Sequence, residues 1–124
     1  MERMVSQDAI SETEDYARRV LAVDDDPEVR LRLAMLLTRT GRLDEGTRQL
    51  EQYIEFNDAN GKAWALLAEA LAMQNRLAEG DQAMERALKV DSSSIVRQQA
   101  IMYYMGTGRP ELAQAIESQG GKQP

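Results

Sequence analysis

Apolar residues recur at helical spacing along most of this chain, and turn-forming residues separate the helices that they predict. The first predicted helix covers about residues 11–23. Hairpins follow in residues 27–60, 61–94 and 95–119, and each hairpin joins two antiparallel helices through a short turn. The pattern therefore predicts an all-α chain in which each helix has one apolar side to bury.

Capping residues support the predicted helix ends. Ser11 can cap the amide of Glu14 while Glu14 reaches back, which is the capping-box arrangement of a helix that begins here. The acidic run at 24–26 ends this helix, and its last residue is expected to cap the next one, which opens with Pro27. A calcium loop would need ligands at alternate positions and a central Gly, which do not follow this run, so helix capping is the better interpretation.

Glycines are expected to serve two structural purposes. Gly41 ends the first helix of its hairpin in the left-handed conformation, and Asn75 takes the same place in the second hairpin. Gly46 and Gly80 lie inside predicted helices, where glycine costs up to about 1 kcal/mol relative to alanine. Close packing of the paired helices is the expected compensation for that cost.

A repeat of 34 residues underlies the first two hairpins, because 27–60 aligns with 61–94 without a gap. The residues of the first copy that recur unchanged 34 positions later are Leu33, Ala34, Leu37, Arg42, Leu43, Glu45, Gly46 and Glu51. The third hairpin matches at 33 residues when Gly108 is aligned with Asn75, so one residue has been lost between Val90 and Gly108. The register of its first helix is therefore left open by one residue.

Both copies resemble the tetratricopeptide repeat (TPR), a helical hairpin with large and small apolar residues at fixed positions. Those positions hold Arg30, Leu33, Ala34, Leu37, Gly41, Leu43, Gly46 and Leu50 in one copy, and Trp64, Leu67, Ala68, Leu71, Asn75, Leu77, Gly80 and Met84 in the other. Arg30 departs from the pattern, which has an aromatic residue there. The resemblance implies an all-α superhelix of stacked antiparallel helix hairpins, with about two full repeats plus flanking partial repeats. It implies a repeat domain at 11–119. The N-terminal segment at 1–10 is a candidate for disorder, and residues 120–124, which have no apolar side chain, are expected to form a flexible tail. Trp64 and Met84 are expected in the core.

The resemblance also implies that the first helix of every hairpin lines a concave groove that binds a partner. The residues that it places in this groove are Leu31, Met35, Thr38, Arg39, Lys62, Ala65, Glu69, Ala72, Met73, Gln98, Met102 and Met105. This set is rich in methionine, whose flexible side chain suits an amphipathic helix or an extended apolar segment of another protein. Met35 and Met73 are expected to be exposed.

Composition excludes several classes of site. The net charge of −6 works against binding of a phosphate backbone, so no nucleic-acid partner is expected. The chain has no Cys and no His, so no disulfide, metal site or cofactor is expected. No spacing of carboxylates, Lys or Ser suggests catalysis, so the protein is not expected to be an enzyme.

The hydropathy of the sequence indicates the cellular location that is expected for this protein. The first ten residues lack the basic start and apolar stretch of a secretory signal, and the apolar region at 63–73 is too short to span a bilayer. A cytoplasmic location without direct membrane insertion is expected. A periplasmic one is expected if these residues are a fragment of an exported or anchored protein.

Two functions follow from the resemblance. The first is a TPR adaptor or chaperone-like protein that binds an apolar or amphipathic segment of a partner. Some members of the family clamp acidic C-terminal tails with Lys, Asn and Arg, but those places hold Leu31, Met35 and Leu66, so that ligand is not expected. The alternative is a self-associating structural or scaffold component of a larger assembly, such as a secretion or envelope complex, which forms a homodimer through its exposed end helices.

Overall fold

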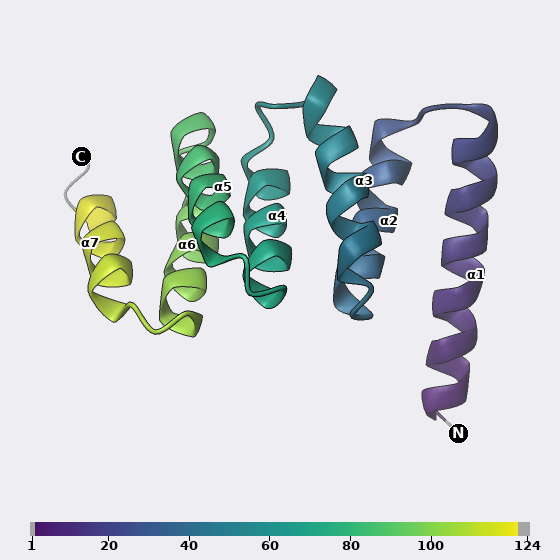
Figure 1. The fold of residues 1–124 in the computed structure, drawn as a ribbon, viewed down its shortest axis with the longest axis horizontal. Helices are drawn as coiled ribbons and strands as arrows, with labels where there is room; N and C mark the ends of the chain where they lie inside the picture. Colours follow the sequence, from purple (N-terminus) through teal and green to yellow (C-terminus); the bar gives the residue numbers. More distant parts are fainter. Residues whose placement is uncertain (1, 122–124) are drawn as a thin grey trace. The chain divides into compact units, whose positions relative to one another are not determined.

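The computed structural model describes the backbone of residues 2–121 and the side chains of residues 7–119. The described residues form seven α-helices and no strand (Figure 1). The helices are α1 (Glu2–Val23), α2 (Pro27–Arg39), α3 (Leu43–Phe56), α4 (Gly61–Met73), α5 (Leu77–Val90), α6 (Ser94–Gly106) and α7 (Pro110–Gly121). The all-α prediction is confirmed.

The chain divides into two compact units, Met1–Tyr53 and Ile54–Pro124, with the boundary near the end of α3. The first contains α1, α2 and most of α3, and the second contains α4 to α7. The predicted single domain at 11–119 stays a prediction, and the predicted tail at 120–124 lies mostly outside the described residues.

Helix α1 is longer than predicted, because it begins at Glu2 and not at Ser11. Residues 2–10 contain no Gly or Pro that would interrupt a helix, and the Thr13 hydroxyl donates to the carbonyl of Ala9 within it. The predicted capping box at Ser11 is therefore wrong. Ser11 is an exposed residue inside α1, and Glu14 has other partners.

Side-chain caps open three of the shorter helices. The Asp26 carboxylate accepts from the backbone amides of Glu28 and Val29 at 3.0 and 3.3 Å, and Pro27 follows as the first helical residue, as predicted. Asn60 caps α4 and Ser93 caps α6 in the same way, each accepting from the amide three residues later. Local sequence therefore sets where these helices begin.

The same turn closes the first helix of all three hairpins. Its central residue has a positive φ, which is 82° at Gly41, 61° at Asn75 and 80° at Gly108. The amide of the arginine that follows then donates to a carbonyl in the last turn of the helix. These bonds join Arg42 to Leu37 at 2.9 Å, Arg76 to Leu71 at 2.9 Å and Arg109 to Tyr104 at 2.8 Å.

The structure settles the register of the third hairpin. Helices α4 and α6 both contain 13 residues. The connection before α4 is 57–60, whereas the connection before α6 is 91–93, so the lost residue falls in a loop and not in a helix. A constant shift of 33 residues therefore relates every position of α6 to one of α4. Met102 is equivalent to Glu69, and Met105 is equivalent to Ala72.

In the first unit, the core joins α1 to α2 and α2 to α3. Ala17 of α1 packs with Leu33 and Leu37 of α2. Across the hairpin, a Cβ added to Gly46 would lie 2.9 Å from the Thr38 Oγ1 and 3.3 Å from the Thr38 amide nitrogen. Glycine at position 46 is thus what allows α3 to approach α2 this closely.

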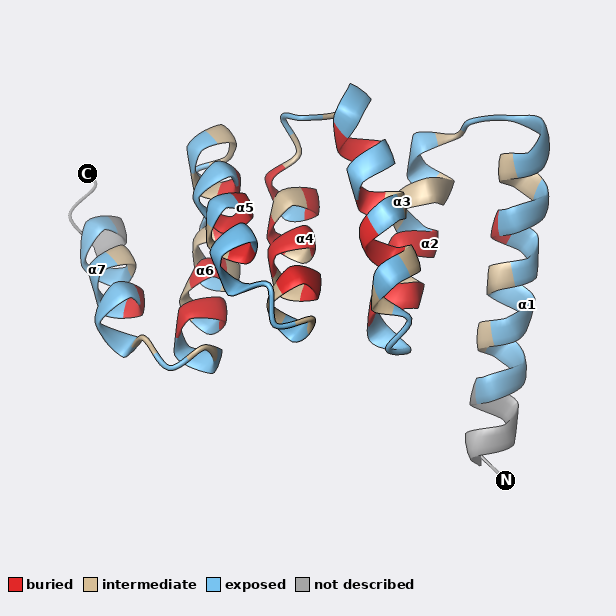
Figure 2. Ribbon diagram, viewed as in Figure 1, coloured by how far each residue is buried: buried red, intermediate tan, exposed pale blue. Residues whose placement is uncertain are grey.

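In the second unit, α4 packs against α5 and α6, and α6 packs against α7. Figure 2 shows buried residues concentrated on α4 and on parts of α5 and α6. Leu67 is buried and Met84 is fully buried, as predicted, whereas Trp64 is only partly buried. A Cβ on Gly80 would lie 3.0 Å from the Ala68 carbonyl oxygen and 2.7 Å from the Tyr103 hydroxyl, so α5 also requires glycine where it crosses its partner.

We expect Gly80→Ala to destabilise the protein even though alanine is the better helix former. The added methyl group has backbone on one side and a hydrogen-bonded tyrosine on the other, so overpacking should cost roughly 1–3 kcal/mol. Gly106→Ala is the matched control, because a Cβ there meets nothing within 4 Å and φ is not positive. Thermal unfolding followed by circular dichroism should show a lower midpoint for the first variant and an equal or higher midpoint for the control. Equal midpoints for the two variants would contradict this packing.

Candidate protein-interaction surface

Helices α4 and α6 of the second unit carry most of the predicted partner-binding residues. The two helices contact each other and run in the same direction, because each is followed by a helix that returns antiparallel to it (Figure 1). Residues at equivalent positions therefore point the same way from neighbouring helices. In this register, Glu69 on α4 occupies the position equivalent to Met102 on α6, and Ala72 occupies the position equivalent to Met105.

Large apolar side chains are exposed at the C-terminal ends of these helices. Met73 on α4 is 60% exposed, and Met102 and Met105 on α6 are 65% and 57% exposed. Met102 and Met105 are three residues apart, so they lie on one side of α6, while Met73 lies one turn after Glu69 on the matching side of α4. We call these three residues the methionine face. The predicted exposure of Met73 is confirmed.

Glu69 lies within this surface as a half-buried carboxyl group. Burial raises its pKa above the ordinary value for glutamate, because removal from water disfavours the charged form. It has no hydrogen bond or ion pair with any described residue. Lys62, two turns earlier on α4, is exposed.

Two predicted groove residues do not line an accessible surface. Thr38 is buried where α3 approaches α2, and its hydroxyl donates to the Ala34 carbonyl at 2.8 Å. Its position against Gly46 leaves it only 6% exposed. Ala65 is fully buried, because its methyl group is too short to emerge from the packed surface of α4. These two assignments are corrected.

The remaining predicted residues are at least partly accessible. Leu31 and Met35 on α2 are half-buried, so Met35 is less exposed than expected. Ala72 on α4 is also half-buried, whereas Arg39 on α2 and Gln98 on α6 are exposed. The structure thus brings together the accessible residues of α4 and α6, and it leaves those of α2 in the other unit.

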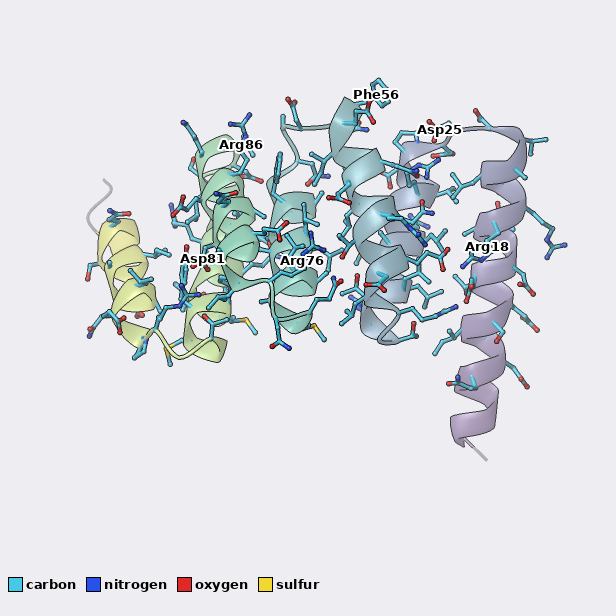
Figure 3. The ribbon with its side chains drawn as sticks, in the orientation of Figure 1. Arg18, Asp25, Phe56, Arg76, Asp81 and Arg86 are labelled. Atoms are coloured by element: carbon cyan, nitrogen blue, oxygen red, sulfur yellow. The ribbon has the colours of Figure 1, made fainter. Side chains whose placement is uncertain are left out.

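A cluster of four charges holds α1 to the following hairpin in the first unit. Arg18, which Figure 3 labels on α1, donates to Glu14 at 2.7 Å and to Glu45 of α3 at 2.8 Å. Arg42, in the turn before α3, completes the cluster by pairing with Glu14 at 2.6 Å. Hydrogen bonds from Arg42 and then from Arg18 lower the pKa of Glu14 to about 2.

A second cluster joins α5 to the last hairpin. Asp81, which Figure 3 labels on α5, accepts from the Arg109 guanidinium at 2.8 Å and from the Tyr103 hydroxyl at 2.8 Å. The guanidinium also lies over the Tyr104 ring, 5.2 Å from its centroid. The pKa of Asp81 is lowered, chiefly by the hydrogen bond from Arg109. Burial raises the pKa of Tyr103, and its hydrogen bond to Asp81 adds to that effect.

Both clusters use an arginine whose role the repeat pattern does not reveal. Arg42 and Arg109 each follow the left-handed turn residue and reach back to the helix before their own hairpin. Their acidic partners, Glu14 and Asp81, each lie 28 residues before the arginine, so both pairs have the same spacing in the sequence. The recurring arginine with an acid 28 residues before it was therefore an available signal in the sequence. Arg76 does not follow this spacing, because Arg48 stands at that distance, and it pairs with Glu79.

The comparisons with known proteins support the fold. No family model and no curated protein matches the chain. Solved structures of MamA, a TPR-like helical protein, are similar to it. The MSR-1 C2 structure has a TM-score of 0.71 and 19% identity, covering 94% of this chain and 72% of that one. The AMB-1 P212121 structure has a TM-score of 0.71 and 22% identity, covering 95% of this chain and 66% of that one.

A third MamA structure, AMB-1 C2221, has a TM-score of 0.69 and 21% identity, and it covers 97% of this chain and 72% of that one. Identities this low establish a shared fold of TPR-like stacked hairpins and nothing about function. Among the described residues, no helix combines the length and the apolar character needed to cross a membrane. In the same part of the chain, no acidic side chains gather in a group able to hold a metal ion.

We expect the stability that Glu14 contributes to disappear in acid. Its pKa is lowered on folding from 4.5 to about 2, so the contribution is complete above pH 4.5 and is lost as pH falls towards 2. Thermal unfolding midpoints are measured from about pH 6 to about pH 2 for the unchanged protein and for Glu14→Gln. The midpoint of the unchanged protein should be the higher one near about pH 6, and the two midpoints should converge as the pH approaches about 2.

Glu12→Gln provides the control for this experiment, because Glu12 is an exposed acid of the same helix with no contact to Arg18 or Arg42. Its midpoints should follow those of the unchanged protein across the whole pH range. If the Glu14→Gln curve also ran parallel to that of the unchanged protein, the four-charge cluster would not be stabilising the fold.

Proposed function

We propose that this protein is an interaction module that binds an apolar or amphipathic segment of a partner protein through the methionine face. The observation that carries the proposal is the exposure of Met73, Met102 and Met105 on two neighbouring helices. Isolated exposed apolar residues are ordinary, but a group of large ones on adjoining helices is typical of a binding surface.

The chemistry of methionine favours a peptide segment as the ligand. Its unbranched thioether side chain can change rotamer to match different shapes, which suits a surface that receives the apolar side of a helix or an extended chain. The scaffold beneath is held firmly, because α5 crosses α4 at Gly80 and the same hydrogen-bonded turn closes α4 and α6. Adaptable side chains on a fixed backbone are a suitable combination for an adaptor.

The accompanying fold supports the same proposal. The structural neighbours are TPR-like proteins, and stacked helical hairpins commonly provide extended surfaces for partners. The candidate site contains no pair of hydrogen-bonded catalytic side chains among the described residues, and its accessible groups are thioethers and one carboxyl. An adaptor or scaffold is therefore the function that the surface supports best.

Exposed apolar residues on α1 favour self-association as a second candidate function. Tyr16 is 63% exposed and Val23 is 89% exposed, while Ala17 of the same helix packs against α2. A helix whose apolar residues are only partly covered can gain further burial from a second copy of the chain. This candidate uses residues that the methionine face does not.

We expect Met73→Glu combined with Met102→Glu to reduce partner binding by at least about tenfold, because two charges would then be desolvated against an apolar ligand. The measurement is quantitative capture of proteins from native lysate by the immobilised chain, followed by mass spectrometry. Gln82→Glu, an exposed change on α5, is the control and should retain the same proteins. Equal capture by all three proteins, with unchanged helix content, would reject the methionine face as the binding surface.

For the second candidate, we expect sedimentation velocity at several concentrations to show a dimer that dissociates when Tyr16 and Val23 are both replaced by glutamate. Both side chains are exposed, so the double change should leave the monomer folded. A sedimentation coefficient that stays monomeric at every concentration, with or without the changes, would remove self-association as a function of α1.

A further inference from the structure

Glu69 differs from the other half-buried acids in the part of the chain that the structure describes. The others all accept at least one hydrogen bond: Glu14, Asp26, Glu45, Asp81 and Asp91. Glu69 accepts none, although it is removed from water to a similar degree. Water still reaches its oxygens, but partial burial without a donor disfavours the charged form, and full burial under a ligand would add to that cost.

The position of Glu69 links it to the methionine face. It lies one turn before Met73 on α4, and the equivalent position on α6 is Met102. A ligand that covers Met73 and Met102 together therefore passes over Glu69 as well. Such a ligand would complete the burial of the carboxylate, and an apolar ligand with no donor would make that burial still more unfavourable.

We propose that the segment bound by the methionine face carries a lysine or arginine that pairs with Glu69, flanked by apolar residues that contact Met73, Met102 and Met105. This inference rests on the proposed function and specifies the chemistry of its partner. The occupant is a basic amphipathic segment of another protein. An uncharged apolar helix is disfavoured because it would leave the Glu69 carboxylate buried without a donor.

Several features of the surface fit a cationic side chain of this kind. The methylene groups of lysine or arginine can lie along methionine thioethers while the charged end reaches the carboxylate. Arginine can in addition donate to both carboxylate oxygens at once. The net charge of −6 would also attract a basic segment at long range, which raises the rate of encounter.

Selection from a displayed library of random peptides tests the proposal while the natural partner is still unidentified. The full chain and its Glu69→Gln variant are used as parallel baits, with the Met73→Glu and Met102→Glu double variant as the background. We expect peptides selected by the unchanged chain to carry a Lys or Arg three or four positions from apolar residues. The Glu69→Gln bait should select peptides without this basic preference.

A synthetic peptide of the selected consensus then gives the magnitude. Its affinity for the unchanged chain, measured by fluorescence anisotropy, should exceed its affinity for Glu69→Gln by at least about tenfold. A second peptide with norleucine in place of the basic residue should bind the two proteins equally. Glu69→Lys as a third bait should reverse the preference and select acidic peptides.

The outcomes separate this inference from the proposed function. If the unchanged chain selects no peptides beyond those of the double methionine variant, the proposed function fails and the inference fails with it. If peptides depend on the methionines but show no basic preference, or the same preference with Glu69→Gln, the inference is overturned while the proposed function stands. Should Glu69→Gln prove unstable, the pair of synthetic peptides still decides the question on the unchanged chain.

Discussion

The close approach of the two helices in the first and second hairpins is the constraint on which the other features of this protein depend. At Gly46 and at Gly80 the space for a side chain is taken by the partner helix, including its backbone. That contact sets the distance between the helices, and the left-handed turn residue sets where one ends and the next begins. With distance and register both fixed, the first helix of a hairpin can display side chains outward from a rigid support. The methionine face needs this support because its own side chains are flexible.

Polar clusters add a second level of order, since each holds a hairpin to the helix before it. Arg42 pairs with Glu14, and Arg109 pairs with Asp81 while stacking over tyrosine rings. In both cases the backbone amide of the arginine donates to a carbonyl in the last turn of the preceding helix, so the turn fixes the place from which the side chain extends. Partly shielded, bidentate arginine pairs of this type contribute more than exposed ion pairs do, because less water competes for the charges.

Sequence reasoning succeeded where short-range rules apply. The helix start at Asp26 and the left-handed turns at Gly41 and Asn75 follow from residues near one another in the chain and were predicted. The caps at Asn60 and Ser93 obey the same local rule but were not predicted. Close packing at Gly80 was predicted because the glycine lies inside a helix. It failed where the answer depends on distant residues. Thr38 looked accessible from its place in the repeat, but it is buried because α3 approaches at Gly46. The length of α1 was missed because Ser11 offered a start signal, although nothing before it stops a helix. The partners of Arg42 and Arg109 were not predicted, although each acid lies 28 residues before its arginine, because that separation joins different helices and lies outside the short-range rules.

The candidate surface combines exposed methionines, which would contribute affinity for a partner, with one carboxyl group, which would contribute selectivity. Burial of Met73, Met102 and Met105 would contribute affinity to almost any apolar segment, because the hydrophobic effect has no direction. Glu69 would contribute discrimination, because a segment without a donor leaves its carboxylate desolvated and unpaired. The free chain keeps an unfavourable group at the surface, which lowers its own stability slightly and raises the cost of binding the wrong segment. An apolar surface that contains one unpaired acid can therefore be adaptable in shape and still selective in charge.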